Sequence, residues 1–164
     1  MRKKIITLDE LEQEIQTARR QGQTVVFTSG CFDVLHAGHV TYLAEAKAKG
    51  DILVVLLNSD SSVRALKGSS RPIVPEHERA VVIAGLESVD YVCIFSDRTP
   101  CSIIDRIQPD IVVKGGDYAG IQIPEMEHTA AYGGRVDYVS MIDGCSTTNI
   151  IEKIKRTMEA KNVC

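Results

Sequence analysis

Short apolar runs alternate along the chain with longer amphipathic segments. The apolar runs are rich in β-branched and aliphatic residues, and they predict strands at 25–28, 52–57, 91–95, 111–113 and 136–139. The segments between them repeat apolar positions at helical spacing and predict helices at 8–22, 39–49, 62–66, 76–86, 99–108, 124–132 and 146–160. Such alternation with short connections is typical of a parallel sheet covered by helices on both faces.

Residues at the segment ends support this division. Thr7 and Glu10 have the spacing of a capping box before the first helix, and Gly22 follows its end. The run 52–57 is apolar on both faces, as a buried parallel strand is. We therefore predict an α/β fold, a Rossmann-like doubly wound sheet of five parallel strands in the order 3-2-1-4-5, preceded by an N-terminal helix. We expect a single domain over 1–164 with its catalytic core at about 24–160.

Composition narrows the class of protein. The chain has 164 residues, of which 44% are hydrophobic and 25% charged, as in globular domains. A net charge of −3 argues against a dedicated duplex-DNA binder. No apolar run reaches the roughly 20 residues that span a bilayer, and we do not expect the first residues to be a signal peptide, because they hold no long apolar segment. Five cysteines without a C-x-x-C pair favour reduced thiols over a zinc site or disulfides. We expect a cytoplasmic protein without nucleic-acid or membrane partners.

The segment after the first predicted strand holds the strongest candidate chemistry. Ligands of doubly wound sheets bind beyond the carboxyl ends of strands one and four. We read His39 as the start of a helix whose free N–H groups bind phosphate, which Gly38 lets approach the backbone. His36 and His39 can donate hydrogen bonds to phosphate oxygens and stabilise the charge of a phosphoryl-transfer transition state. The alternative is a zinc site with Asp33 as a third ligand, but the glycine between the histidines favours phosphate.

Two further segments follow strands four and five. Lys114 precedes a Gly-Gly pair and Asp117, which can accept a hydrogen bond from a ribose or orient a cation, although an ordinary turn explains these residues as well. Ser146, Thr147 and Thr148 open the last helix. Ser146 fits an N-cap, and three hydroxyl residues exceed what one cap needs, so a second phosphate-binding helix terminus is equally consistent.

Cations and thiols near these segments have alternative interpretations. Lys67 and Arg71 lie on a predicted flexible segment that either closes over a polyphosphate or is a solvated loop. Arg79 either binds a phosphate or pairs with Glu76 one turn earlier. We predict that the cysteines of the candidate loops, Cys31 among them, are small packing residues, because no general base surrounds them.

These segments resemble a known family. His36-Ala-Gly-His39 is similar to the HxGH signature of the small nucleotidyltransferases, the cytidylyltransferase-like family, and Gly30-Cys-Phe-Asp33 resembles their G-x-F-D segment. Glu78-Arg79 and the stretch 144–148 resemble the family's middle and last helices. The likeness runs from about 25 to 155. It is closest to the heptose 1-phosphate adenylyltransferase branch, on the segments 40–43, 67–68, 71–73, 113–118 and 143–151.

The resemblance implies a reaction and a set of roles. AMP would pass from ATP to a sugar 1-phosphate such as heptose 1-phosphate in one in-line displacement, giving a nucleotide sugar and pyrophosphate. The implied catalytic residues are His36, His39 and Lys67. The implied nucleotide-binding residues are Gly30, Cys31, Phe32, Asp33, Gly38, Asp117, Ser146, Thr147 and Thr148. Arg79 and Lys114 are the candidates for the acceptor phosphate. Mg²⁺ would be held mainly by the triphosphate, without a metal site in the protein, and the resemblance implies a homodimer.

One departure from the wider family bears on the substrate. Cytidylyltransferases for glycerol 3-phosphate and choline phosphate carry Arg-Thr-x-Gly where this chain has 141–144 without an arginine, which favours the heptose branch. The sugar-kinase half of some heptose enzymes is missing, so a separate kinase is expected if the chain is complete. Two alternatives stay open: a CTP-dependent cytidylyltransferase for an alcohol phosphate or phosphonate, and a non-catalytic nucleotide-binding module. His36, His39, Lys67 and the Ser-Thr-Thr run argue against the second.

Overall fold

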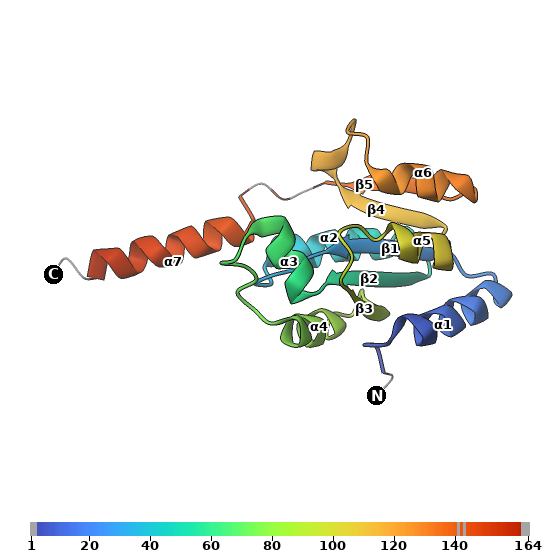
Figure 1. Ribbon diagram of the computed structural model, residues 1–164, viewed down its shortest axis with the longest axis horizontal. Coiled ribbons are helices and arrows are strands. Elements are labelled where there is room, and N and C mark those ends of the chain that lie inside the picture. Colours follow the sequence, from blue (N-terminus) through green and yellow to red (C-terminus); the bar gives the residue numbers. More distant parts are fainter. Residues whose placement is uncertain (1–2, 141, 143, 162–164) are drawn as a thin grey trace.

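The fold is a five-stranded parallel sheet between two layers of helices (Figure 1). The computed structural model describes residues 3–140, 142 and 144–161. The strands are β1 (Val25–Gly30), β2 (Ile52–Asn58), β3 (Tyr91–Phe95), β4 (Ile111–Gly115) and β5 (Arg135–Val139). They pair in parallel in the order β3-β2-β1-β4-β5. The fold class and strand order predicted from the sequence are therefore confirmed.

The helices lie close to their predicted positions. They are α1 (Leu8–Arg20), α2 (Ala37–Lys47), α3 (Asp60–Lys67), α4 (Glu76–Ala84), α5 (Cys101–Ile107), η1 (Gly116–Tyr118), α6 (Pro124–Ala131) and α7 (Thr147–Lys161). The capping box of α1 is present, since the backbone N–H of Thr7 donates to Glu10 Oε2 at 2.8 Å. The helix predicted from His39 begins two residues earlier, because His36 takes the extended N-cap conformation with φ −143°. The 3₁₀ turn η1 was not predicted.

Each face of the sheet packs against its own helices. Successive side chains of a strand point to opposite faces, so Val25 and Phe27 of β1 pack with α1 and α5, whereas Val26 packs with α2 and α4. All three side chains are at most 1% exposed. Burying such a side chain contributes roughly 1.5–3 kcal/mol, which explains why the strands read as unbroken apolar runs.

Strands β1 and β4 are joined at the end where the candidate residues lie. The Thr28 hydroxyl donates to the carbonyl oxygen of Val113 at 3.1 Å, and its Oγ1 lies 2.7 Å from the Tyr42 hydroxyl of α2. Burial raises the pKa of Tyr42 to about 12, so its hydroxyl stays protonated. These buried contacts fix α2 against β1 and β4.

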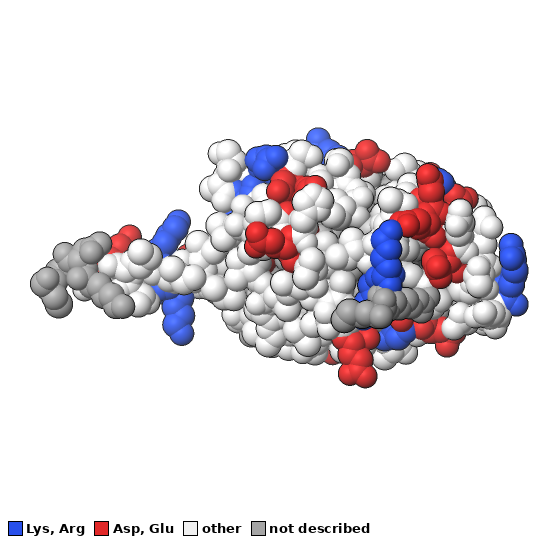
Figure 2. All heavy atoms as spheres, turned by 90° about the horizontal axis from the view of Figure 1, so that it is seen from below, with Lys and Arg blue, Asp and Glu red and all other residues white. Residues whose placement is uncertain are grey.

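The outer surface is mixed in charge, and α7 stands apart from it. On the face that Figure 2 shows, acidic and basic side chains are interspersed over the body and along α7. Helix α7 projects away from the sheet as a single helix (Figure 1). Among the described residues, none of the helices has the length and apolar character needed to cross a membrane. Met141 and Asp143, which belong to the segments 141–144 and 143–151 of the resemblance, and Cys164, one of the five cysteines, lie outside the described residues.

Candidate active site

A pocket of about 250 Å³ lies at the carboxyl ends of β1 and β4. This is the place in a doubly wound sheet where successive connections leave in opposite directions and ligands bind. Most of the predicted site residues line this first pocket: Gly30, Cys31, Phe32, Asp33, Gly38, His39, Lys67, Lys114, Asp117 and Thr147. Four other predicted residues, His36, Arg79, Ser146 and Thr148, are not part of its lining. The structure thus brings together segments that are far apart in the sequence.

The two histidines form a stacked pair. Their ring centroids are 3.8 Å apart with 25° between the planes, and His39 is the one that lines the pocket. Burial lowers the pKa of His39 to about 4, with the charges of His36 and Lys67 adding to the effect. Burial also lowers the pKa of His36. Both rings are therefore neutral at pH 7, so they offer N–H donors rather than positive charges.

Neither ring is tied to the protein through Nδ1. The Nδ1 atoms of both histidines are buried and have no hydrogen-bond partner among the described residues. The zinc alternative lacks the ligands it needs, because no group of three or more His, Cys, Asp or Glu side chains within 3–140, 142 and 144–161 is placed to hold a metal ion. The Nδ1 atoms of the pair therefore have hydrogen-bonding capacity that the described part of the protein does not use.

Gly38 is required by the packing of the histidine pair itself. A Cβ atom there would lie 3.0 Å from Cε1 and Nδ1 of His36 and 3.0 Å from Cβ of Cys145. These distances are shorter than normal carbon contacts. We predicted that this glycine admits a phosphate, and the structure adds a second reason: any larger residue would push His36 or the segment before α7 away.

The loop between β1 and α2 has an unusual backbone. Phe32 has φ +44° and Val34 has φ +51°, in the left-handed region that is unfavourable for side chains with a Cβ and most unfavourable for a β-branched one. The Phe32 ring is only 7% exposed and meets the His39 ring edge-on, with centroids 5.3 Å apart. The strained loop therefore supplies a wall that holds His39 in place.

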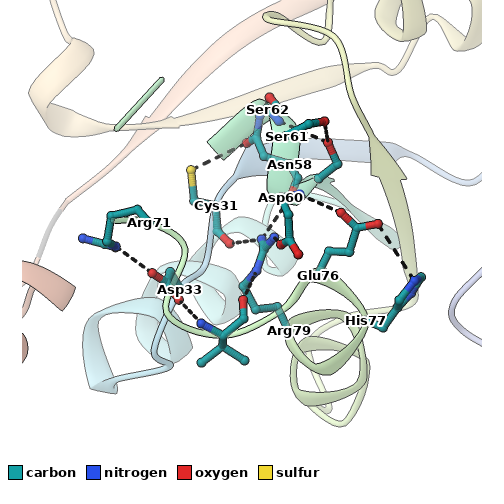
Figure 3. A network of polar contacts seen from close by, with 12 residues as sticks. Cys31, Asp33, Asn58, Asp60, Ser61, Ser62, Arg71, Glu76, His77 and Arg79 are labelled. Atoms are coloured by element: carbon teal, nitrogen blue, oxygen red, sulfur yellow. Dashed lines mark hydrogen bonds and ion pairs between the residues drawn. The ribbon is translucent and has the colours of Figure 1, made fainter. Parts of the chain in front are cut away.

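Asp33 holds the neighbouring loop rather than offering its carboxylate to a ligand (Figure 3). Its Oδ2 accepts from Arg71 Nε at 2.7 Å and from the N–H of Ile73 at 2.9 Å, and its Oδ1 accepts from the N–H of Val74 at 2.9 Å. Burial alone would raise the pKa of Asp33, but these hydrogen bonds outweigh burial and lower it. The side chain is 1% exposed. Asp33 therefore lines the pocket as predicted residues do, but its carboxylate oxygens are taken up by the loop 68–75, which they order.

Lys67 and Arg71 differ in how they are held. Lys67 is the last residue of α3, not part of the loop as predicted, and Gly68 ends the helix with φ +92°. Its side chain is exposed and has no hydrogen-bond or ion-pair partner among the described residues, so it is free to meet an anion. Arg71 lines the same pocket but is fixed by Asp33.

Arg79 corrects a prediction. It is 2% exposed and lines neither of the two pockets described here. Its Nη1 donates to the carbonyl oxygens of Cys31 at 2.6 Å and Asn58 at 2.9 Å, and its Nη2 lies 2.8 Å from Asp60 Oδ1 (Figure 3). The expected pairing with Glu76 is also wrong, because the ion pair is with Asp60. These bonds leave the guanidinium no access to an acceptor phosphate. Arg79 instead joins the loop after β1, the end of β2 and the start of α3.

The start of α7 contributes one of its three hydroxyl residues to the pocket. Ser146 is the N-cap, since its Oγ accepts from the N–H of Asn149 at 3.1 Å. Thr147 lines the pocket, and its hydroxyl donates to the carbonyl oxygen of Asp33. Thr148 is exposed and does not reach the lining. Ser146 is therefore the helix N-cap that the sequence suggested, and Thr147 is the residue of this run that lines the pocket.

Cys31 is a packing residue by its environment. Burial raises the pKa of its thiol, even though the nearby cations Lys67, Arg79 and Arg71 lower it. A protonated thiol is a weak nucleophile. The structure records Cys31 as a free cysteine in contact with Asn58, at 4.0 Å from Sγ to Oδ1.

A second pocket of about 490 Å³ adjoins the first. The two share Ser29, Gly30, Cys31, Lys67, Lys114 and Tyr118 as lining. Sequence reasoning missed Arg98 and Glu125, which line the second pocket only. Lys114 Nζ lies 2.6 Å from Glu125 Oε1 and 3.1 Å from Ser29 Oγ. Pro124 and Glu125 were noticed only as the start of a helix, and no motif marked the carboxylate.

The fold and the residues of this pocket define the chain as a nucleotidyltransferase-like α/β protein with an HxGH pair at the switch point of its sheet. The chain belongs to the Cytidylyltransferase-like family, whose model matches residues 27–153. Curated relatives include the Bifunctional protein HldE of Syntrophotalea carbinolica, 51% identical over 92% of this chain, and that of Salmonella arizonae, 50% identical over 94%. The chain spans 31% and 32% of these two relatives.

Solved structures agree with this assignment. A lipopolysaccharide core biosynthesis protein from Thermoplasma volcanium has a TM-score of 0.60 and 30% identity, with 74% of this chain and 98% of that chain covered. A pantoate-beta-alanine ligase from Francisella tularensis, solved with an ATP analogue and beta-alanine, has a TM-score of 0.60, covering 85% of this chain and 67% of that chain. It is 12% identical, so the likeness to the ligase concerns the fold alone. The resemblance stated from the sequence is confirmed.

Proposed function

We propose that the chain transfers AMP from ATP to a sugar 1-phosphate, with heptose 1-phosphate as the leading candidate, and releases pyrophosphate. The observation that carries the proposal is the neutral His36–His39 pair at the switch-point pocket, with the free ammonium of Lys67 beside it. The identity of 51% to a Bifunctional protein HldE supports the choice of a heptose substrate and of this branch.

The reaction is a single in-line displacement. A phosphate oxygen of the acceptor attacks the α-phosphorus of ATP, the bond from the α-phosphorus to the bridging oxygen breaks, and pyrophosphate leaves with that oxygen. No covalent enzyme intermediate forms, so the protein acts by positioning and by stabilising charge. His39 donates an N–H to the phosphate oxygens, and this hydrogen bond strengthens as charge moves to the leaving group. His36 stacks on it and sets its orientation.

The remaining cations and the last helix complete the binding of phosphates. Lys67 closes over the triphosphate, and Thr147 with the free N–H groups at the start of α7 receives the leaving phosphates. Lys114 contacts the acceptor phosphate. Ser146 and Thr148 act through the helix terminus rather than through contacts of their side chains. Gly30 and Gly38 allow the backbone to approach the nucleotide.

Mg²⁺ accompanies the triphosphate in this proposal and supplies neutralisation of its negative charge. The residues fit a metal held mainly by phosphate oxygens and water. Asp33 is occupied by the loop 68–75, and Asp117 is the carboxylate in the described lining of the first pocket without a hydrogen-bond partner. Asp117 therefore orients the ribose or a water of the hydrated metal ion.

The proposal includes assembly and location. The protein is a homodimer that pairs through α7, where Ile154 is 53% and Met158 is 63% exposed along an apolar groove of the projecting helix. It works in the cytoplasm, where reduced thiols are the rule. Sedimentation velocity tests the assembly. A monomer at micromolar concentration would contradict it.

A pyrophosphate-release assay tests the reaction. Purified protein is mixed with ATP, CTP, GTP or UTP, each against heptose 1-phosphate and glycerol 3-phosphate. We expect release with ATP and heptose 1-phosphate. Release with CTP and glycerol 3-phosphate would replace the proposal by the cytidylyltransferase alternative. Nucleotide binding without turnover of any pair would make the chain a binding module.

Two variants assign the reaction to the site. His39→Ala is expected to lower kcat by ~10²-fold, the loss typical of one preorganised donor. His128→Ala is the matched control, because His128 pairs with Asp105 on α5 and lies outside both pockets. Lys67→Ala is expected to raise the KM for ATP. Equal kinetics of His39→Ala and wild type would remove His39 from the mechanism.

A further inference from the structure

Helix α7 is amphipathic, but its own chain does not cover it. It leaves the sheet as a single projecting helix (Figure 1), and its described side chains at 152–160 are all exposed. A helix of about this length is marginal in water by itself, because most helical stability in proteins comes from the packing of an apolar face. Helix α7 therefore needs a surface that the described part of its own chain does not provide.

An apolar stripe runs along α7. Ile150, Ile154 and Met158 recur every four residues, so they lie on one face of the helix. Ile154 is 53% and Met158 is 63% exposed, and both line a groove together with Lys153 and Thr157. Contiguous apolar surface of this kind marks a contact with another protein surface.

The charge of α7 distinguishes between possible partners. Its sequence holds four basic and two acidic residues, which give a formal charge of +2, whereas the whole chain carries −3, so the rest of the chain carries −5. Two α7 helices would repel each other, but α7 and the body of a second copy attract each other. Charge complementarity therefore favours contact of α7 with the body of a second copy over the pairing of two α7 helices.

Helix α4 offers a matching surface on that body. Glu78, Val81 and Val82 lie three and four positions apart on one face of α4, and all three are exposed, Val81 to 63% and Val82 to 45%. The valines suit the apolar stripe of α7, and Glu78 suits its basic residues. Figure 1 shows α4 and the start of α7 toward the same end of the long axis of the molecule. A twofold arrangement can therefore bring each α7 to α4 of the other copy.

The start of α7 belongs to the active-site pocket. Thr147 lines the pocket, and its hydroxyl donates to the carbonyl oxygen of Asp33. In the proposed function, the free N–H groups of this first turn receive the leaving phosphates. A first turn is held in place only as firmly as the helix that follows it, so whatever supports α7 also shapes the pocket.

We propose that α7 of one copy packs on the exposed face of α4 of a second copy, and that this contact holds the start of α7 in the pocket. The active site is then complete only in the dimer. The inference rests on the proposed function and deepens it, because it gives the homodimer a receiving surface and gives assembly a consequence for the binding of ATP. A monomer lacks the support of α7 and binds ATP more weakly.

Two single variants test the contact from its two sides. Ile154→Glu places a charge on the stripe of α7, and Val81→Glu places one on the face of α4. Both side chains are more than half exposed, so neither change should unfold the protein. Sedimentation velocity from about 10 nM to about 10 µM measures assembly. Titration with ATP and Mg²⁺ measures the Kd for ATP without turnover.

We expect both variants to sediment as monomers at concentrations where the wild type is a dimer. The Kd for ATP should rise about tenfold in both, although neither residue lines the two pockets at the end of the sheet. Met126→Glu is the matched control, because Met126 is 38% exposed on α6, outside both faces, and this variant should behave as the wild type. Dilution of the wild type below its dimer range should weaken ATP binding in the same way, which tests the dependence without any substitution.

Three results would overturn the inference. The wild type could be a monomer throughout the concentration range. Val81→Glu could remain a dimer while Ile154→Glu is a monomer, in which case α7 docks elsewhere. Monomeric variants could bind ATP as tightly as the wild type, in which case the dimer does not complete the site. A wild-type dimer that binds ATP but releases no pyrophosphate with any acceptor would instead refute the proposed function and leave the dependence of ATP binding on assembly standing.

Discussion

Asp33 is hydrogen-bonded to the loop 68–75, and the loss of these bonds has a clear expected consequence. Asp33→Asn removes the charge that faces Arg71 and replaces one acceptor oxygen by an NH₂ group. At least one of the three hydrogen bonds, to Arg71, Ile73 or Val74, is then lost, because each carboxylate oxygen is in use. The NH₂ group would face an N–H donor. The loop that follows Lys67 should come loose.

The loss of stability in Asp33→Asn depends on how deeply the Asp33–Arg71 ion pair is buried. Breaking a buried ion pair costs ~3–5 kcal/mol, but Arg71 is 13% exposed and can turn to water, so the lower end applies. We expect the free energy of unfolding to fall by about 3 kcal/mol. Domains of this kind are stable by roughly 5–15 kcal/mol, so the variant should stay folded. The pair of Asp137 with Lys49 is more exposed, with 37% and 26% of the side chains accessible, and Asp137→Asn should cost less than about 1 kcal/mol.

Two measurements check this expectation. Urea unfolding compares the stability of both variants with wild type. Limited trypsin digestion reports cleavage after Lys67, which should be faster in Asp33→Asn because the loop that follows is no longer held. The KM for ATP should rise with it. A stability loss no larger than that of Asp137→Asn, with unchanged cleavage, would refute the idea that Asp33 orders the loop.

Two further predictions concern the histidine pair. Gly38→Ala gains about 1 kcal/mol of helix propensity but places a Cβ 3.0 Å from the His36 ring, and overpacking costs about 1–3 kcal/mol, so thermal unfolding and pyrophosphate release should show lower stability and lower kcat. A more stable variant of full activity would contradict this. The pKa of His39 is lowered from 6.5 to about 4, so between these pH values the unfolded chain binds a proton at this ring that the folded chain does not bind. The free energy of unfolding should therefore fall as the pH drops from about 6.5 to 4. Solvent around the ring limits this loss to about 1 kcal/mol at pH 5, and His39→Gln should lack it in urea titrations at pH 7 and pH 5.

The sheet was predictable because its determinants are local. Each strand is a run of apolar residues that must be buried on both faces, and the alternation with helices leaves few topologies. The start of α2 was misplaced by two residues because His36 is not among the side chains that commonly cap helices, and nothing else in the sequence marks the first turn. The sequence also placed Lys67 in a loop, whereas Lys67 is the last residue of α3 and Gly68 ends the helix.

The partners of buried charges were not predictable. Arg79 was placed correctly on a helix, yet its direction depends on carbonyl oxygens of Cys31 and Asn58, which lie 48 and 21 positions away in the sequence. Glu125 meets Lys114 only because β4 and α6 pack together. Spacing along a chain reveals which side chains share a face of one element, and it carries no information on contacts between elements.

The site therefore combines two kinds of polar residue that a sequence does not distinguish. Asp33 and Arg79 are buried and have their hydrogen bonds satisfied by the protein, so they can only position the loops around the pocket. Lys67 is exposed, has no hydrogen-bond or ion-pair partner among the described residues and lines both pockets, so it has capacity left for a ligand. Buried charges rarely add stability compared with an apolar core, so their use here is to fix loop geometry. On this reasoning, substitutions of the first kind should change stability and activity together, whereas substitutions of the second kind should change substrate affinity alone.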